Sequence, residues 1–315
     1  MLLYVNEEEV GRLVDIHDAI SVLEEVGKSM ADQETIFLPR ARLRMRNGFL
    51  HFMPASLEAA GYFGYKSYTS FKGVARFLVF LHDNSNGELR AVIEGDKLGQ
   101  LRTGAASGVA TKYLSRKGAD TLGIIGAGYQ AETQLAAALA VRNVTGVKIF
   151  SRNYERAEQF CERMQKISKV RLEPVKNVEE AAAGDVVKTV TAATSPVLFG
   201  KMVKPGCHIN AVGGNMLVKR ELDEEVIERA DMIVIDSREQ GKIECGDFLP
   251  LMDKGKMHWE DIFEYQDLFN SRAMRKAETD ITLFKSQGIA PWDVALAKLV
   301  YERALQHKAG RQIPI

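Results

Sequence analysis

The chain contains 315 residues, and its 42 Lys and Arg residues balance 42 Asp and Glu residues. A net charge of zero gives no electrostatic reason to expect nucleic acid or an anionic membrane as a partner. No apolar run approaches the roughly 20 residues that a membrane helix needs. Acidic residues begin at Glu7, so we expect no secretory signal. The length is sufficient for two domains with large buried cores.

The cysteines and histidines indicate neither a disulfide framework nor a metal site. Cys161, Cys207 and Cys245 are far apart in the sequence and form no CxxC motif. An odd number of isolated cysteines is typical of a reducing compartment, so we expect a cytoplasmic protein. The six histidines show no metal-ligand spacing, and no metal is predicted.

The first hundred residues predict one helix and then strands that follow one another directly. The helix is expected near residues 19–30. Turn signals such as residues 83–87 separate the strand-like runs, which cover residues 40–45, 49–53, 62–68, 77–82 and 89–93. Strands that follow strands indicate a mostly antiparallel sheet and therefore a domain of its own.

Strands and helices then alternate from about residue 118 to residue 290, after a helix expected at 101–114. The short strand-like runs are residues 122–125, 147–151, 186–190, 208–212, 232–235 and 281–284. Such alternation indicates a parallel, doubly wound sheet. No motif is assigned to residues 241–269.

An amphipathic pattern over residues 292–305 follows Pro291 and predicts a C-terminal helix that packs back on the first domain. The predicted fold class is therefore α/β with two domains. A Rossmann domain with a doubly wound parallel sheet is expected at 117–291. A discontinuous α+β domain is expected at 1–116 and 292–315.

The sequence TLGIIGAGYQA, at residues 121–131, predicts a dinucleotide-binding turn between a strand and a helix. The first glycine permits the tight turn, and the second lets the backbone approach a pyrophosphate at the helix N-terminus. The alanine at the third position lets the helix pack closely on the strand. The predicted cofactor contacts here are Gly126, Gly128, Tyr129, Gln130 and Ala131.

The next predicted strand bears on which nicotinamide cofactor is bound. It ends in Ser151, Arg152 and Asn153, where an NAD-preferring fold normally carries Asp or Glu for the ribose 2′-hydroxyl. No carboxylate repels a 2′-phosphate here, and Arg152 can pair with one. NADP(H) is therefore predicted as the preferred cofactor, with NAD(H) possible. An ordinary solvated arginine at 152 is the alternative interpretation.

Four segments together resemble the ornithine cyclodeaminase/mu-crystallin family. They are LRTGAA at 101–106, GAGYQ at 126–130, HINAVGG at 208–214 and KSQGIAPWD at 285–293. The segments keep the order of the family and span almost the whole chain. The resemblance implies a homodimer built through the N-terminal domain, with the active site between the two domains. The strand end near Arg152 is most similar to the mu-crystallin and ketimine reductase branch.

The resemblance also implies the residues that hold a substrate. Arg40 lies 13 positions before Met53 and matches an arginine that binds the substrate carboxylate, an interaction suited to bidentate pairing. Arg102 matches a second arginine, between substrate and cofactor. Lys66 matches the active-site lysine, and neighbouring arginines should lower its pKa so that it exchanges a proton with the substrate. Surface arginines and a solvent-facing strand lysine are the alternative interpretations.

Further cofactor contacts follow from the same resemblance. Some of these residues have purely structural alternatives, such as a threonine that caps a strand. The positions are Arg102, Thr103, Ser151, Arg152, Asn153, Thr191, Val212, Ser286 and Gly288.

One position departs from the cyclodeaminase and alanine dehydrogenase pattern, which has an aspartate after the glycine pair. This chain has Asn215 after Gly213 and Gly214. Asparagine cannot take up a proton as a base, although it can hydrogen-bond a substrate nitrogen. Mu-crystallin-like members also lack the aspartate. Asn215 is therefore a candidate catalytic residue beside Lys66, and the change favours imine reduction.

The sequence thus predicts a homodimeric, NADP(H)-dependent oxidoreductase that acts on a small amino or imino acid. The expected reaction reduces pyrroline-2-carboxylate or piperideine-2-carboxylate to the cyclic amino acid. The alternatives within enzymes are an ornithine cyclodeaminase, which is a lyase, and an alanine-type amino-acid dehydrogenase. An alternative of another class is a non-catalytic NADPH-binding protein similar to mu-crystallin.

Overall fold

The computed structural model describes residues 2–314 and divides the chain into two compact units. Unit 1 extends to Ala105 and resumes at Ile289, and unit 2 extends from Ala106 to Gly288. The first division falls within a single helix, α3 (Asp96–Leu114), whereas the sequence pattern placed it after that helix. A helix of 19 residues gives no local signal that its two halves belong to different units.

Unit 1 is built on a sheet in which, among residues 2–314, only β1 and β7 pair in parallel. The sheet order is β16-β1-β7-β6-β5-β4-β2, and β3 pairs with β4. The strands are β1 (Leu2–Val5), β2 (Thr35–Phe37), β3 (Ala41–Met45), β4 (Gly48–Leu57), β5 (Tyr62–Phe71), β6 (Val74–Asp83), β7 (Leu89–Glu94) and β16 (Arg311–Ile313). The mostly antiparallel sheet expected from the sequence is confirmed, although β1, β2 and β16 were not expected.

Strand β4 is longer than the sequence pattern indicated because it continues through Pro54. Phe52 is the last β4 residue that pairs with β3, and Ala55 is the first that pairs with β2. Pro54 therefore lies between two partner strands on that edge, where its missing N–H costs no ladder hydrogen bond. The strand keeps its register with β5 throughout, including Met53 opposite Lys66.

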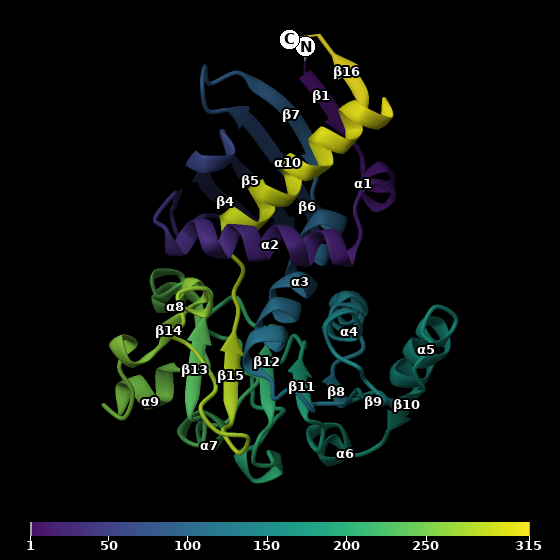
Figure 1. Ribbon diagram of the computed structural model, residues 1–315, viewed down its shortest axis with the longest axis vertical. Coiled ribbons are helices and arrows are strands. Elements are labelled where there is room, and N and C mark those ends of the chain that lie inside the picture. The colour runs from purple at the N-terminus through teal and green to yellow at the C-terminus, as the bar shows by residue number, and fades with distance from the viewer. Residues whose placement is uncertain (1, 315) are drawn as a thin grey trace. The chain divides into compact units, whose positions relative to one another are not determined.

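Helices α2 and α10 cover one face of this sheet (Figure 1). The helices of unit 1 are α1 (Glu7–Leu13), α2 (Ile16–Ala31), a short 3-10 turn (Glu58–Ala60), the first part of α3, and α10 (Ala290–His307). Asn6 and Asp15 form capping boxes that start α1 and α2. Pro291 lies in the first turn of α10, where it needs no hydrogen-bond donor. As expected, α10 packs against the N-terminal elements α2, β4 and β5.

Unit 2 contains a parallel sheet in the order β10-β9-β8-β11-β12-β15-β13-β14. Its strands are β8 (Thr121–Ile125), β9 (Gly146–Phe150), β10 (Leu172–Val175), β11 (Val186–Thr189), β12 (His208–Ala211), β13 (Met232–Ile235), β14 (Phe263–Glu264) and β15 (Thr282–Lys285). Six of these match the expected strands to within a residue or two. The predicted Rossmann fold class is confirmed.

The helices of unit 2 lie on both faces of its sheet. They are α4 (Tyr129–Val141), α5 (Tyr154–Gln165), α6 (Val178–Ala182), α7 (Glu224–Glu228), α8 (Arg238–Glu244) and α9 (Leu249–Asp253), with 3-10 turns at Gly200–Met202, Trp259–Asp261 and Tyr265–Leu268. The second part of α3 also belongs to this unit. Ile124 belongs to the same buried cluster as Leu135 of α4, whereas a Cβ on the neighbouring Gly123 would strike Ala181 of α6. Adjacent strand residues face opposite sides, so α4 and α6 cover opposite faces.

Within residues 2–314, none of the helices combines the length and the apolar character that crossing a bilayer requires.

Candidate functional site

Unit 1 gathers the three predicted substrate-binding cations around one carboxylate that the sequence analysis did not single out. Lys66 lies on β5, Arg102 on α3, and Asp293 in the first turn of α10. Lys66 Nζ donates to Asp293 Oδ1 at 2.9 Å, and Arg102 Nε donates to the same oxygen at 3.3 Å. All three side chains are at most one-tenth exposed. Three segments far apart in the sequence thus form one buried ionic cluster.

Arg40 belongs to the same cluster. It lies between β2 and β3, is 4% exposed, and donates from Nε to Met53 Sδ at 3.1 Å. Its charge acts on both Lys66 and Asp293. The alternative in which these arginines and the lysine simply face solvent is wrong for all three, because each is buried.

Burial and charge oppose each other in this cluster. Burial lowers the pKa of Lys66, the Asp293 carboxylate opposes that change, and Arg102 and Arg40 add to it, so that the pKa stays below its usual value. Burial alone would raise the pKa of Asp293, but the charges of Arg102 and Lys66 overcome it and lower that pKa. Asp293 is therefore ionised at neutral pH, and the cluster carries an excess of positive charge that suits a substrate carboxylate.

Unit 2 forms the expected glycine turn between β8 and α4. Gly126 has φ of +120°, and a Cβ there would lie 2.5 Å from the Val190 carbonyl oxygen, so only glycine fits. Gly128 precedes the first turn of α4, and a Cβ there would have no described atom within 4 Å. The open space beside a helix N-terminus fits a cofactor pyrophosphate. Ala131 is fully buried, whereas Tyr129 is exposed and Gln130 half-buried.

The other predicted cofactor residues of unit 2 follow the carboxyl ends of neighbouring strands. Because these strands are parallel, their carboxyl ends meet at one edge of the sheet, where open α/β sheets bind ligands. The residues are Ser151 after β9, Thr191 after β11, Val212 after β12, and Ser286 and Gly288 after β15. Arg152 is exposed just beyond β9, and Asn153 caps α5 through its side chain.

Glu221 is a further residue of this edge that the sequence analysis missed. Its fully buried carboxylate accepts from Thr191 N at 2.7 Å, Thr191 Oγ1 at 2.8 Å, Thr189 Oγ1 at 2.9 Å and Gly213 N at 2.7 Å. It therefore ties the loop after β11 to the loop after β12. The sequence left two interpretations of Thr191 open, as a cofactor contact or as a strand cap. The structure adds a third role, because the Thr191 hydroxyl donates a hydrogen bond to Glu221.

Two more buried carboxylates hold the neighbouring loops. Asp247 accepts from the Glu221 and Leu222 N–H groups at 2.7 and 2.9 Å, and its Oδ2 lies 2.8 Å from Lys285 Nζ. Burial alone would lower the pKa of Lys285, but Asp247 raises it above its usual value. Asp236 accepts from three successive residues after β15, namely Ser286 Oγ, Gln287 N and Gly288 N. These carboxylates lacked a sequence signal because nothing local marks which backbone groups they meet.

The positions of Thr103 and Asn215 give little support to their predicted roles. The Thr103 hydroxyl donates to the Gly99 carbonyl within α3 at 2.7 Å. Asn215 is exposed in the loop that follows β12. Within residues 2–314, no three His, Cys, Asp or Glu side chains gather in a way that holds a metal ion. Cys161, Cys207 and Cys245 are all buried free thiols.

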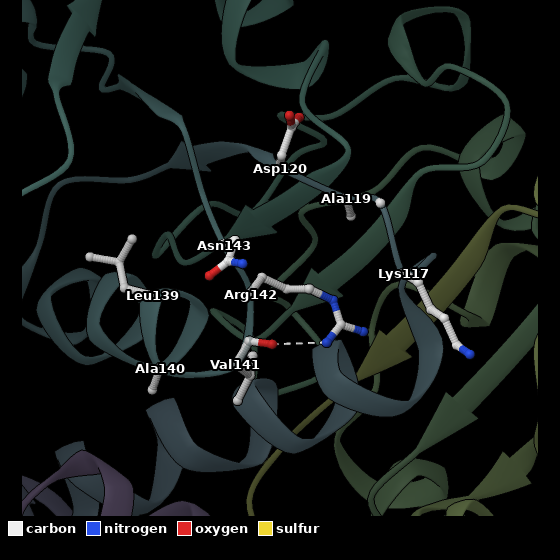
Figure 2. Close-up of a pocket in the computed structure, with 9 residues that line it drawn as sticks. Lys117, Ala119, Asp120, Leu139, Ala140, Val141, Arg142 and Asn143 are labelled. Carbon is white, nitrogen blue, oxygen red and sulfur yellow. Dashed lines mark hydrogen bonds between the residues drawn. The ribbon is translucent and has the colours of Figure 1, made fainter.

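A pocket in unit 2 lies at the opposite end of the strands, before β8 and after α4 (Figure 2). Its arginine, Arg142, is occupied by structural hydrogen bonds: Nη1 donates to the Val141 carbonyl at 2.8 Å, and Nη2 donates to the Thr111 and Lys112 carbonyls at 3.0 and 2.9 Å. Arg142 therefore caps the C-terminus of α3. We assign the pocket no part in cofactor binding, because the cofactor residues follow the carboxyl ends of the strands.

A nucleotide-binding sheet together with a buried cluster of cations defines the class of protein, and comparison with known proteins identifies the family. Residues 3–308 match the model of the ornithine cyclodeaminase/mu-crystallin family. The chain belongs to this family, as the sequence resemblance predicted. The ketimine reductase mu-crystallin of Rattus norvegicus is 38% identical over 263 residues, which cover 81% of this chain and 80% of that protein.

Two solved structures resemble the whole chain. The Δ1-pyrroline-2-carboxylate reductase of Thermococcus litoralis, in complex with NADH and L-proline, is 33% identical with a TM-score of 0.94, over 99% of this chain and 100% of that chain. An archaeal alanine dehydrogenase dimer with bound NAD is also 33% identical, with a TM-score of 0.93, over 100% and 99% of the two chains.

Proposed function

We propose that this protein is a nicotinamide-dependent reductase of a small cyclic imino acid, of the pyrroline-2-carboxylate or piperideine-2-carboxylate type. The observation that carries the proposal is the buried cluster of Arg40, Lys66 and Arg102 around Asp293. It offers guanidinium groups for a carboxylate and an ammonium group for a nitrogen. The similarity to a ketimine reductase and to a pyrroline-2-carboxylate reductase supports the same reaction.

In this reaction Arg40 and Arg102 bind the substrate carboxylate and so orient the C=N bond. A bound nicotinamide supplies the hydride to the imine carbon. Lys66 gives the proton on its ammonium group to the imine nitrogen. The neutral Lys66 side chain then regains a proton from solvent. One hydride and one proton together convert the imine to the amine. Asn215 contributes a hydrogen bond to the substrate nitrogen but no proton.

The cofactor is held by the glycine turn of Gly126 and Gly128 and by the loops after β9, β11, β12 and β15. We propose NADP(H) as the preferred form, because exposed Arg152 follows β9 and no carboxylate occupies residues 151–153. NAD(H) remains the cofactor of the solved relatives. The three buried free thiols support a cytoplasmic location.

The first experiment follows absorbance at 340 nm with each imine and with NADPH or NADH. Faster oxidation of NADPH is expected, with kcat/KM at least tenfold above that with NADH. Lys66→Met should lower kcat by 10²-fold or more, on the order of a general acid's contribution, with little change in NADPH affinity. Turnover near that of the parent protein at saturation would remove Lys66 from the mechanism.

An alanine-type dehydrogenase is the second candidate, because the archaeal alanine dehydrogenase matches the whole chain. Asn215 favours the reductase, since it cannot act as a base toward an amino acid. Oxidation of alanine with NAD⁺ or NADP⁺, in the absence of any turnover of either imine, would establish this second candidate instead. Cofactor binding without turnover of imines, alanine or ornithine would establish a binding protein.

A further inference from the structure

We propose that Asp293 and Gly99 are positioning residues for Lys66: Asp293 anchors its ammonium group, and Gly99 leaves the space that this group occupies. Both act on the residue that donates the proton, so the inference rests on the proposed function. Neither residue needs to touch the substrate. Both lie in unit 1 with Lys66 itself.

The anchor is an interaction between buried groups with defined geometry. Asp293 Oδ1 accepts from Lys66 Nζ at 2.9 Å and from Arg102 Nε at 3.3 Å, whereas Oδ2 has no hydrogen-bond partner among the described residues. Asp293 is completely buried. One carboxylate oxygen is thus shared by the proton donor and by a carboxylate-binding arginine, which fixes the two groups relative to each other. The other oxygen remains open to a further donor.

Gly99 provides the space beside the ammonium group. It lies in α3, one turn before Thr103. A Cβ at Gly99 would lie 2.8 Å from Lys66 Nζ, and Lys66 Nζ is the one atom outside the helix that it would approach within 4 Å in the described chain. A methyl group here would therefore displace the end of the lysine and little else. The helix has no other conformational need for glycine at this position.

The groups that face the ammonium come from five segments. Asp293 comes from α10, Arg102 from α3, and Arg40 from the segment before β3. Two aromatic rings also lie near it: the Phe77 ring of β6 is centred 5.0 Å from Lys66 Nζ, and the Tyr68 ring of β5 is centred 5.9 Å away. Of these five residues, Asp293 alone carries a negative charge. Removing that charge should lower the pKa of Lys66 further, because burial and both arginines already lower it.

The first test is the pH dependence of imine reduction in Asp293→Asn, which keeps the size of the side chain. Reduction requires protonated Lys66, so the rate falls as pH rises through the pKa of that lysine. In the variant, the fall in kcat should occur at a pH lower by roughly one to three units. Activity should therefore be lost at high pH and partly recovered at low pH. A uniform loss of kcat at every pH would contradict the anchoring role.

The matched control is Glu302→Gln. It makes the same chemical change on the same helix, but Glu302 is exposed and pairs with Lys298. Its pH profile should coincide with that of the parent protein. Gly99→Ala is the second variant, and it should lower kcat at least tenfold while the KM for NADPH and the melting temperature change little. An unchanged kcat in Gly99→Ala would show that the lysine tolerates displacement.

A readout without turnover separates this inference from the proposed reaction. The protein is prepared with lysine labelled with ¹³C at Cε, and Lys66→Met identifies the Lys66 signal. The chemical shift should titrate at lower pH in Asp293→Asn than in the parent protein, whether or not any imine is reduced. If the parent protein reduces no imine but the titration shifts, the reaction is wrong and the anchor stands. An identical titration in both proteins would overturn the anchor.

Discussion

Lys188 shows how strongly one buried residue can affect stability. It lies in the central strand β11 between Ile124 of β8 and Asn210 of β12, and it is completely buried. Its Nζ donates to Gln134 Oε1 of α4 at 3.3 Å. Burial lowers the pKa of Lys188 from 10.5 to about 7. The proposed reaction makes no use of this lysine.

We expect Lys188→Met to stabilise the protein near neutral pH. The unfolded chain binds a proton below pH 10.5 that the folded chain does not bind until about pH 7, so stability falls as pH decreases through this window. At about 1.4 kcal/mol per unit, the penalty reaches roughly 4 kcal/mol at pH 7, part of which the bond to Gln134 offsets. Denaturant unfolding at pH 7 and pH 10 measures the change.

The gain from Lys188→Met should shrink toward zero at the higher pH. The exposed Lys201 in the same unit supplies the control, because Lys201→Met should change the free energy of unfolding by less than about 0.5 kcal/mol at either pH. An equal gain at both pH values would mean that packing, and not the proton, determines the effect.

At the scale of the elements, buried carboxylates connect the loops that follow neighbouring strands of unit 2. Strands β11 and β12 end in different loops, and Glu221 accepts hydrogen bonds from both through Thr191 and Gly213. Its four hydrogen bonds need an acceptor on each oxygen. The arrangement keeps the loops of two adjacent strands in register at the edge where the cofactor is proposed to bind.

Glu221→Gln should loosen these two loops. The amide nitrogen cannot accept from a backbone N–H, so at least one buried donor loses its partner, at a cost of roughly 1–3 kcal/mol. We expect a lower melting temperature and a dissociation constant for NADPH at least tenfold higher by fluorescence titration. Glu239→Gln, at an exposed position of α8, is the control. NADPH affinity equal to that of the parent protein would show that the loops do not need Glu221.

At the scale of the whole molecule, one face of the unit 1 sheet carries exposed apolar side chains. Met53, Lys66 and Val79 pair across β4, β5 and β6 and are buried. Their neighbours point to the other face, where Phe52 is 41% exposed and its ring lies 5.0 Å from that of Tyr65. Exposed apolar residues on the same face are Ile36, Leu43, Phe71 and Val74.

We propose that this face joins two copies of the chain, since large apolar patches on a protein surface commonly mark interfaces. The similarity to an alanine dehydrogenase dimer supports self-association. Sedimentation should give twice the mass of one chain, and the double variant Leu43→Asp, Phe52→Asp should sediment as a monomer. Ile167→Asp changes an apolar residue of unit 2 that is more exposed than either of these, and it should leave the dimer intact. A dimer that persists in the double variant would place the interface elsewhere.

The sequence by itself determined the features that local pattern encodes. Alternation of short apolar strands with helices predicted the parallel sheet of unit 2, and the spacing of Gly126 and Gly128 predicted its turn. Family motifs singled out Arg40, Lys66 and Arg102, which the structure brings together in one cluster. Local pattern suffices in these cases because strand periodicity, helix caps and backbone conformation depend on neighbouring residues.

Only the tertiary structure decided how distant charges pair. Asp293 meets Lys66 across 227 positions of sequence, and Glu221 and Asp247 close loops whose backbone partners no motif names. The position of the division within α3 and the hydrogen bond of Lys188 to Gln134 were equally absent from the local pattern. Burial and electrostatic pairing depend on which segments fold against each other, and a linear pattern carries no direct record of that choice.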